Sequence, residues 1–314
     1  MGHPGKQPVI KVFFAKELGF CWGVERAINL AAQAKNQYPG EVTILKEIVH
    51  NTQVVDFFRK KGVGQTNTLD TIERGTMVIS AHGLSPKLKT EAENKGLNII
   101  DTTCPLVENV HNFTRQLLGE GYQVILYGEP GHDEVHGVMG IDEKNIHLLA
   151  EYEDVDRLPK FENGKVALIT QTTRGVKAFE KVCERVKEIY PDIKIVNTIC
   201  DATDKRQHAI HELAPKMDMV LVIGSQSSGN SQRLRDIAKE ICGQAYLIDT
   251  PDQIDWTWFD GCQKVGITAG ASTPNFAVEY ILKAIQAKVG IDIANSACAS
   301  SPRWRRVGGR PRLW

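Results

Sequence analysis

Short runs rich in β-branched residues alternate along this 314-residue chain with amphipathic stretches of helical period. In 177–190, for example, apolar residues recur every three or four positions and so share one face of a helix. Strand followed by helix, repeated, predicts an α/β fold with mostly parallel sheets. The expected strands are 11–15, 42–48, 76–80, 97–101, 124–127, 146–149, 166–170, 193–197, 219–224, 245–248 and 265–268. The expected helices are 23–37, 53–61, 87–95, 108–120, 177–190, 202–216, 231–242 and 274–289.

Three cysteines occur in the same local context. The segments NIIDTTC and KIVNTIC each run from a β-branched strand through Asp or Asn to Thr, with a Cys two places later, and Cys21 likewise lies between a strand and a helix. Their spacing of about one small α/β unit suggests three similar units. We therefore expect three domains, at 10–102 with Cys21, 103–198 with Cys104 and 199–290 with Cys200, whose strand ends could meet at one central point.

Composition excludes several classes of protein. Lys and Arg number 38, as do Asp and Glu, but the last 19 residues hold five Arg and no acid, so the rest has 33 basic and 38 acidic residues, a net of −5. An acidic body argues against nucleic acid as a partner. No apolar run approaches the roughly 20 residues that span a bilayer. The polar first eight residues are not a signal peptide, so we expect a cytoplasmic protein that does not bind membranes.

The segment 291–314 ends in SPRWRRVGGRPRLW, which has no apolar period and many Pro, Gly and Arg residues. We expect 291–314 to be a disordered or non-native extension. The four remaining cysteines, at 183, 242, 262 and 298, are expected to be small buried residues or tail residues.

Polar side chains follow six of the expected strands, at the edge where open α/β sheets bind ligands. Any one of them could be a helix cap or turn residue, but six such ends in one chain favour a binding site. They are His50, His82, His132, Glu134, Thr172, Thr173, Ser228, Asn230 and Ser272. Hydroxyl, amide and imidazole groups at helix N-termini bind phosphate without lysine.

The three shared-context thiols suit either zinc or an iron–sulfur cluster. A cubane cluster held by three cysteines leaves one iron without a protein ligand. Glu134 is the acid best suited to donate a proton, because a carboxyl in a partly desolvated pocket keeps its proton to higher pH.

The sequence resembles the 4-hydroxy-3-methylbut-2-enyl diphosphate reductase family over about residues 12–290. Nine motifs of that family occur in order and at similar spacing. They are GFCWGVERA, IVHN, SAHG, DTTCP, GHDEVHGVMG, TQTT, NTICDAT, GSQSSGN and TAGASTP. The resemblance implies a trefoil of three α/β domains around a central [4Fe–4S] cluster.

The resemblance also implies roles for single residues. Cys21, Cys104 and Cys200 match the cluster ligands, Glu134 matches the proton donor, and Thr172 matches a hydroxyl that relays to the substrate alcohol. The residues that match the diphosphate ligands are His50, His82, His132, Ser228, Asn230 and Ser272. Gly229 departs from the family, which has a serine there.

The implied reaction is a two-electron reductive dehydroxylation of 4-hydroxy-3-methylbut-2-enyl diphosphate to isopentenyl and dimethylallyl diphosphate. The open iron of the cluster binds the hydroxyl, which leaves as water after Glu134 supplies a proton. An external electron donor such as ferredoxin or flavodoxin is expected, because the chain has no convincing nicotinamide or flavin motif.

Two alternatives remain open from the sequence. Quinolinate synthase also places three α/β domains around a three-cysteine cluster, although the SAHG and TQTT segments favour the reductase. A zinc- or cluster-binding sensor without catalysis would need the thiols but not the histidines or Glu134.

Overall fold

The computed structural model describes residues 9–161 and 164–293, and its three parallel sheets flanked by helices confirm the predicted α/β class. The chain forms two compact units. The first contains Met1–Phe20 and Lys205–Trp314, and the second contains Cys21–Asp204. Most of the extension predicted at 291–314 lies outside the described residues, but its first three residues form a strand.

The first unit has one five-stranded sheet. Its strand order is β11 (Ala245–Ile248), β10 (Met219–Ile223), β12 (Lys264–Ala269), β1 (Ile10–Phe14) and β13 (Ile291–Ile293), and all of its pairs are parallel. The sequence prediction grouped the first strand with residues up to 102. In the structure β1 pairs on both sides with strands from the far end of the chain, β12 and β13.

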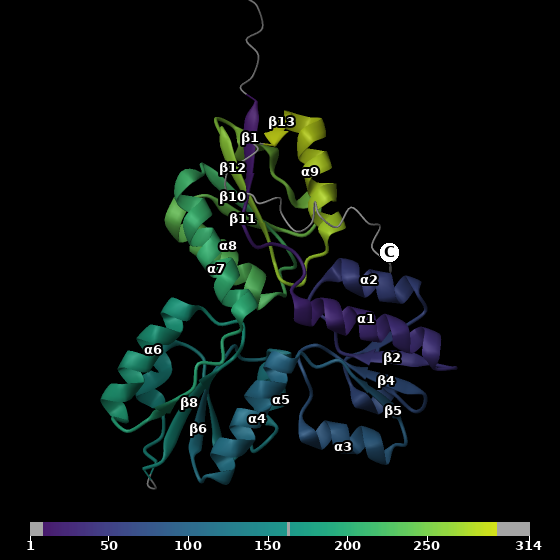
Figure 1. The fold of residues 1–314 in the computed structure, drawn as a ribbon, viewed down its shortest axis with the longest axis vertical. Coiled ribbons are helices and arrows are strands. Elements are labelled where there is room, and N and C mark those ends of the chain that lie inside the picture. The colour runs from purple at the N-terminus through teal and green to yellow at the C-terminus, as the bar shows by residue number, and fades with distance from the viewer. Residues whose placement is uncertain (1–8, 162–163, 294–314) are drawn as a thin grey trace, which may run out of the picture. The chain divides into compact units, whose positions relative to one another are not determined.

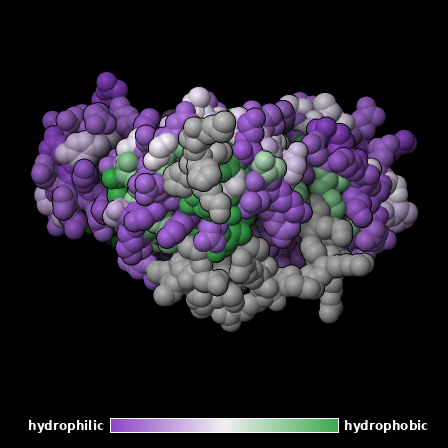
Figure 2. Space-filling model, turned by 90° about the horizontal axis from the view of Figure 1, so that it is seen from above, coloured by the Kyte–Doolittle hydropathy of each residue, from purple (hydrophilic) through white to green (hydrophobic). Residues whose placement is uncertain are grey.

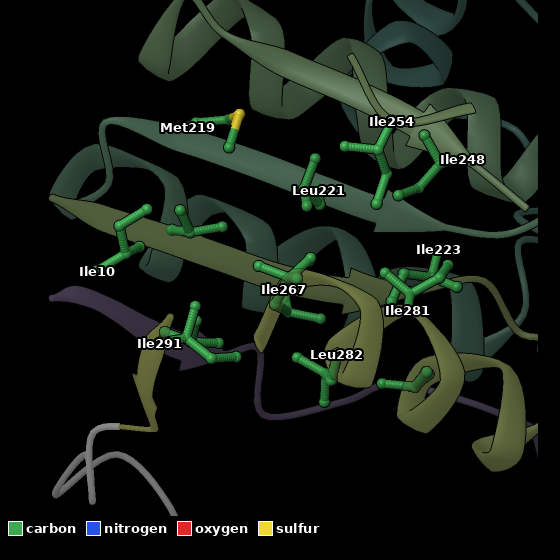
Figure 3. Close-up of a cluster of buried hydrophobic side chains, with 14 of the residues drawn as sticks. Ile10, Met219, Leu221, Ile223, Ile248, Ile254, Ile267, Ile281, Leu282 and Ile291 are labelled. Carbon is green, nitrogen blue, oxygen red and sulfur yellow. The ribbon is translucent and has the colours of Figure 1, made fainter. Parts of the chain in front are cut away.

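Helices cover both faces of this sheet. On one face, α9 (Asn275–Val289) packs Ile281, Leu282 and Ile285 against strand residues such as Leu221 and Ile267 (Figure 3). On the other face, α7 (Asp201–Leu213) and α8 (Gly229–Cys242) pack against Val220 and Val222. Every residue of β10 is buried, as expected for a central parallel strand covered on both faces.

The second unit contains two four-stranded parallel sheets. The first has the order β3 (Gly64–Thr66), β2 (Val42–Leu45), β4 (Thr76–Ile79) and β5 (Asn98–Asp101). Helices α1 (Trp22–Gln37) and α2 (Thr52–Lys60) lie on one face of it, and α3 (Pro86–Asn94) lies on the other (Figure 1).

The second sheet of this unit has the order β7 (Ile146–Leu149), β6 (Gln123–Tyr127), β8 (Val166–Thr170) and β9 (Lys194–Ile195). Helices α4 (Pro105–Gly119) and α5 (Asp133–Met139) bury their apolar residues on one face, and α6 (Val176–Ile189) covers the other. Because all strands in each sheet are parallel, their carboxyl ends lie at the same edge, where the polar segments of the sequence begin.

Short 3₁₀ helices complete the described structure, at Leu69–Thr71, Tyr152–Arg157, Ala214–Lys216, Pro251–Gln253 and Trp256–Phe259. None of the helices in the described ranges has the length and apolar content needed to cross a bilayer. Seen from above, hydrophilic residues cover most of the visible face, and hydrophobic residues show in a few small areas (Figure 2).

Candidate functional site

Cys21, Cys104 and Cys200 share one structural position, the start of a helix. Cys21 and Cys104 are the N-cap residues of α1 and α4, and Cys200 directly precedes α7. In each case the cysteine carbonyl accepts the N–H of the residue four positions later, at 2.9 to 3.0 Å. The thiols therefore lie at the positive ends of helix dipoles, where a thiolate or an anionic metal cluster is stabilised.

Backbone amides of the first turns also reach the sulfur atoms. The N–H of Thr203 lies 3.3 Å from Cys200 Sγ, and the Thr203 hydroxyl lies 3.0 Å from it. Burial raises the pKa of the Cys104 and Cys200 thiols, and the amides of the first helical turns oppose that rise. Cys21 and Glu134 raise the pKa of both thiols further, so each of these two groups lies within electrostatic reach of both Cys104 and Cys200.

The first turn of α1 is fitted closely to Cys104. A Cβ atom at Gly23 would lie only 2.5 Å from Cys104 Sγ, so only glycine leaves room for that sulfur. From the same helix, the Arg26 guanidinium donates to the carbonyl of Thr103 at 3.1 Å. These two contacts fix the helix that begins at Cys21 against the loop that carries Cys104.

In the second unit, main-chain hydrogen bonds join the loops that carry Cys104 and Cys200 to loops that carry candidate site residues. The N–H of Cys104 donates to the carbonyl of Ala81, the residue before His82, at 3.0 Å. The N–H of Cys200 donates to the carbonyl of Thr172, also at 3.0 Å. Parallel neighbours, β4 with β5 and β8 with β9, bring these loops together at the carboxyl edges of their sheets.

Glu134 is almost completely buried, with 2% of its surface exposed, and Thr172 holds its carboxylate. The Thr172 N–H donates to Oε1 and the Thr172 hydroxyl donates to Oε2, each at 2.7 Å. Burial raises the pKa of Glu134 to about 7, against the two Thr172 hydrogen bonds, which lower it. A carboxyl with this pKa can both hold and release a proton near neutral pH.

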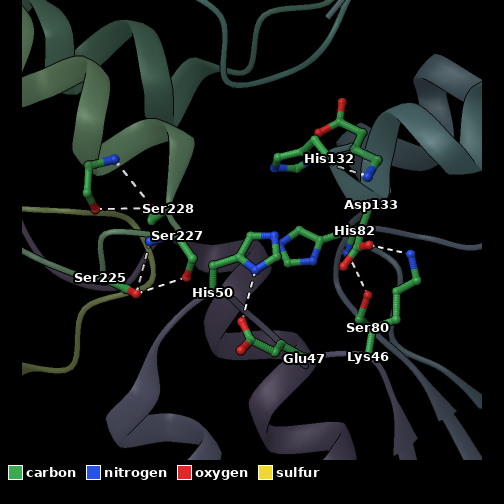
Figure 4. Close-up of polar contacts among 12 residues, drawn as sticks. Lys46, Glu47, His50, Ser80, His82, His132, Asp133, Ser225, Ser227 and Ser228 are labelled. Carbon is green, nitrogen blue, oxygen red and sulfur yellow. Dashed lines mark hydrogen bonds and ion pairs between the residues drawn. The ribbon is translucent and has the colours of Figure 1, made fainter. Parts of the chain in front are cut away.

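His50, His82 and His132 form a compact group (Figure 4). The rings of His50 and His82 stack with centroids 4.1 Å apart, and the His132 ring stands edge-on, 5.2 Å from His50 and 5.5 Å from His82. Burial and the neighbouring His50 lower the pKa of His82 well below its usual value and that of His132 to about 4. Both imidazoles are therefore neutral at pH 7.

Three residues beside this group were not predicted from the sequence. Glu47 Oε2 lies 3.0 Å from His50 Nδ1, and Lys46 forms an ion pair with Asp133 (Figure 4). Lys46 also has a φ of 66°, and no other residue besides glycine has a positive φ in the part of the chain described here. Strained backbone of this kind often occurs at functional sites, and it is a signal that the sequence does not carry.

Ser228, Asn230 and Ser272 belong to the first unit. Ser228 is the N-cap of α8, where its hydroxyl oxygen accepts the Ser231 N–H at 3.3 Å. Asn230 is 5% exposed, and neither polar atom of its side chain has a hydrogen-bond partner among the described residues. Ser272 lies in the buried turn between β12 and α9. Gly224 and Gly270 both approach Ser231 closely, which brings the ends of β10 and β12 together at this helix N-terminus.

The other described cysteines do not begin helices. Cys183 packs against the core beneath α6, Cys262 is buried beneath α9, and Cys242 is the last residue of α8. Burial raises the pKa of Cys183 and of Cys262 to about 11, which makes both thiols poor metal ligands. Cys298 lies outside the described residues.

Comparisons with known proteins agree on one family. A family model described as LytB protein matches residues 12–286. A 4-hydroxy-3-methylbut-2-enyl diphosphate reductase of Polaromonas sp. is 37% identical over 286 residues, which cover 90% of this chain and 86% of the relative. The enzyme of the same name from Aquifex aeolicus is 37% identical over 282 residues, or 88% of this chain and 96% of the relative.

Solved structures are similar too. The E-1-hydroxy-2-methyl-but-2-enyl-4-diphosphate reductase of Plasmodium falciparum matches with a TM-score of 0.87 and 29% identity, covering 92% of each chain. A second structure, described as (E)-4-hydroxy-3-methyl-but-2-enyl diphosphate reductase, the terminal enzyme of the non-mevalonate pathway, matches with a TM-score of 0.64 and 36% identity. That match covers 88% of this chain and 99% of the other.

Proposed function

Because this chain belongs to the LytB protein family, we propose that it reduces 4-hydroxy-3-methylbut-2-enyl diphosphate to isopentenyl and dimethylallyl diphosphate. In this reaction the carbon–oxygen bond of the allylic alcohol breaks, two electrons and two protons enter, and water leaves. The family match favours this reductase over the quinolinate synthase alternative.

The proposed cofactor is a [4Fe–4S] cluster bound by Cys21, Cys104 and Cys200. When bound, such a cluster supplies electrons and one iron that lacks a protein ligand and acts as a Lewis acid. Three thiols at helix N-termini suit this group, because the amides and the dipoles stabilise its negative charge. The glycine at position 23 leaves space beside Cys104 where any other side chain would intrude.

The spacing of the thiols argues against a single zinc ion. Zinc–sulfur bonds of about 2.3 Å in a tetrahedral site require sulfur atoms roughly 3.8 Å apart. The three thiols do not form a set whose sulfur atoms all lie within 4.8 Å of one another. A larger, polynuclear centre therefore fits these donors better than one metal ion does.

In this proposal Glu134 supplies the proton. The burial and hydrogen bonding of its carboxyl are the observation that supports the proposed reaction most strongly. The carboxyl is buried, has a pKa raised to about 7, and lies within electrostatic reach of Cys104 and Cys200. A buried acid at this position can stay protonated at neutral pH until a leaving oxygen needs a proton. Thr172 orients the carboxyl through two hydrogen bonds, and we propose that its hydroxyl also relays to the substrate alcohol.

His50, His82 and His132 bind the diphosphate in this proposal, with Ser228, Asn230 and Ser272 as further ligands. The neutral imidazoles of His82 and His132 can each donate an N–H group to a phosphate oxygen. The buried and unpartnered amide of Asn230 also needs an external partner, because an unsatisfied polar group costs stability. We propose an external protein donor of ferredoxin or flavodoxin type for the electrons.

Anaerobic purification tests the cofactor and the reaction together. We expect a brown protein that contains iron and sulfide, bleaches in air, and forms both five-carbon products from the alcohol when an artificial one-electron reductant is present. A colourless, zinc-containing protein prepared under the same conditions would contradict the proposal. So would a brown protein that leaves the substrate unchanged.

A further inference from the structure

We propose that His50, His82 and Asp133 form a binding site for a divalent transition-metal ion, with zinc as its best match, and that bound zinc competes with the diphosphate of the substrate. Only the competition rests on the proposed function. The metal site itself stands on the geometry of these three side chains.

The three residues converge from different elements of the second unit. His50 precedes α2, His82 follows β4, and Asp133 is the first residue of α5. One ligand atom of each lies within 4.8 Å of the other two. No other set of three His, Cys, Asp or Glu residues in the described ranges meets that limit. Figure 4 shows the two rings and the Asp133 carboxylate around the same small region.

Glu47 gives His50 the environment of a metal ligand. Its Oε2 lies 3.0 Å from His50 Nδ1. In metal sites a ligating histidine almost always donates one ring N–H to a carboxylate or a carbonyl, which directs the other nitrogen at the metal. The Glu47–His50 pair has this carboxylate–histidine arrangement.

His82 contributes a nitrogen that the protein leaves without a partner. Its Nδ1 is buried and, within residues 9–161 and 164–293, accepts or donates no hydrogen bond. An unsatisfied buried nitrogen costs stability, and a metal ion would satisfy it. Burial also lowers the pKa of His82, so that the ring is neutral at pH 7, as a ligand must be.

Two imidazoles and one carboxylate are a donor set that zinc prefers, with a fourth position left for water or another ligand. Bond lengths of about 2.0 to 2.2 Å put tetrahedral ligand atoms roughly 3.4 Å apart. Small side-chain rotations therefore have to bring the three ligand atoms closer together when the ion binds. Asp133 meets Lys46 through Oδ1, so the ion and Lys46 would share this carboxylate.

Occupation of this site would be regulatory rather than catalytic. The same two histidines are proposed ligands of the substrate diphosphate, so a zinc ion bound to them removes both from that role. Zinc should therefore weaken substrate binding without changing the chemical step, which appears as a raised KM at constant kcat.

Calorimetry on the cluster-containing protein tests the site, with zinc delivered under anaerobic conditions. We expect one zinc per chain, with affinity reduced tenfold or more in Asp133→Asn and in His82→Ala. Glu47→Gln should reduce it about tenfold or more, as loss of a carboxylate behind a ligating histidine does elsewhere. His208→Ala is the matched control, because its side chain is 75% exposed on α7, and it should bind zinc like the wild type.

The visible absorption of the cluster is recorded during each titration, so that displacement of iron is detected as bleaching, and circular dichroism checks the fold of each variant. Equal zinc affinity in wild type, Asp133→Asn and Glu47→Gln would overturn the site. Kinetics with free zinc held constant by a nitrilotriacetate buffer test the competition, and an unchanged KM at saturating zinc would overturn it. Turnover without zinc tests the proposed reaction separately.

Discussion

Thr172 holds both carboxylate oxygens of Glu134, with its N–H on Oε1 and its hydroxyl on Oε2, each at 2.7 Å. The carbonyl of the same threonine accepts the N–H of Cys200. One residue therefore positions the buried acid and also contacts the loop of a proposed cluster ligand. A shift of this loop would move the acid and the thiol together.

Replacing Glu134 by Gln should abolish turnover while the cluster is retained. Glutamine has the same shape and can still accept the Thr172 N–H, but it cannot donate a proton to a leaving oxygen. Loss of a general acid typically lowers a rate 10²- to 10⁴-fold, so we expect kcat to fall by about that factor. Steady-state kinetics and iron content measure the two effects separately.

Glu143→Gln is the control for that substitution, because Glu143 is an exposed acid on the turn before β7. It should leave kcat unchanged. If Glu134→Gln turned over substrate as fast as Glu143→Gln, the assigned proton donor would be wrong.

The rate should fall as pH rises through the pKa of Glu134. Burial raises this pKa to about 7, so the carboxyl is protonated below that pH and loses its proton above it. Because the protonated form is the donor, kcat should be constant on the acidic side and decrease about tenfold per pH unit well above pH 7. A kcat profile from pH 6 to 9 checks this. In Glu134→Gln, the residual rate should lack this alkaline limb.

Replacing Cys21, Cys104 or Cys200 by Ser should prevent the protein from holding its cluster. Each substitution removes one of three proposed thiolate ligands, and serine is a poor ligand for iron–sulfur clusters. Iron and sulfide content and visible absorption after anaerobic purification measure the loss. Cys183→Ser is the matched control, because Cys183 packs against the core under α6, and it should keep its iron. Equal iron content in all four variants would exclude the proposed ligand set.

Gly23→Ala should also reduce iron content, although position 23 carries no ligand atom. The added Cβ would lie 2.5 Å from Cys104 Sγ, a separation that forces the sulfur or the start of α1 to move. We expect a loss of at least half of the bound iron. Elemental analysis of the purified protein measures it.

A second glycine provides the control. Gly119 ends α4, and a Cβ there would meet no atom within 4 Å. Gly119→Ala should keep full iron content and raise helix stability by up to about 1 kcal/mol. If Gly23→Ala also kept all of its iron, the close fit of α1 to Cys104 would have no role in holding the cluster.

Much of the fold could be predicted from the sequence because strand and helix periods are local. The strand at 146–149 and the helix ends near Gln37 and Cys242 agree with the structure. Helix α5 was not predicted, since seven residues with a glycine among them are too few to show a helical period. The partners of β1 were not predicted either, because they lie more than 240 residues away in the sequence.

The site could be predicted only in part, for a similar reason. The position of polar residues after predicted strands identified His50, His82 and Glu134 as candidates, the motif resemblance implied roles for them, and those roles stay predictions. The ion pair between Lys46 and Asp133 joins residues 87 positions apart, and no local pattern marks either of them. Lysine rarely adopts a positive φ, so the sequence gives no indication that Lys46 has one.

The position of β1 between β12 and β13 sets an order of events during synthesis on the ribosome. The second unit is one continuous stretch, Cys21–Asp204, so it can fold while the rest of the chain is still being translated. The first unit cannot complete its sheet until β13 has emerged, and the N-terminal strand has no neighbour until β12 has been synthesised. All three proposed cluster ligands belong to this continuous second unit, so they can be presented on a folded scaffold before the first unit is complete.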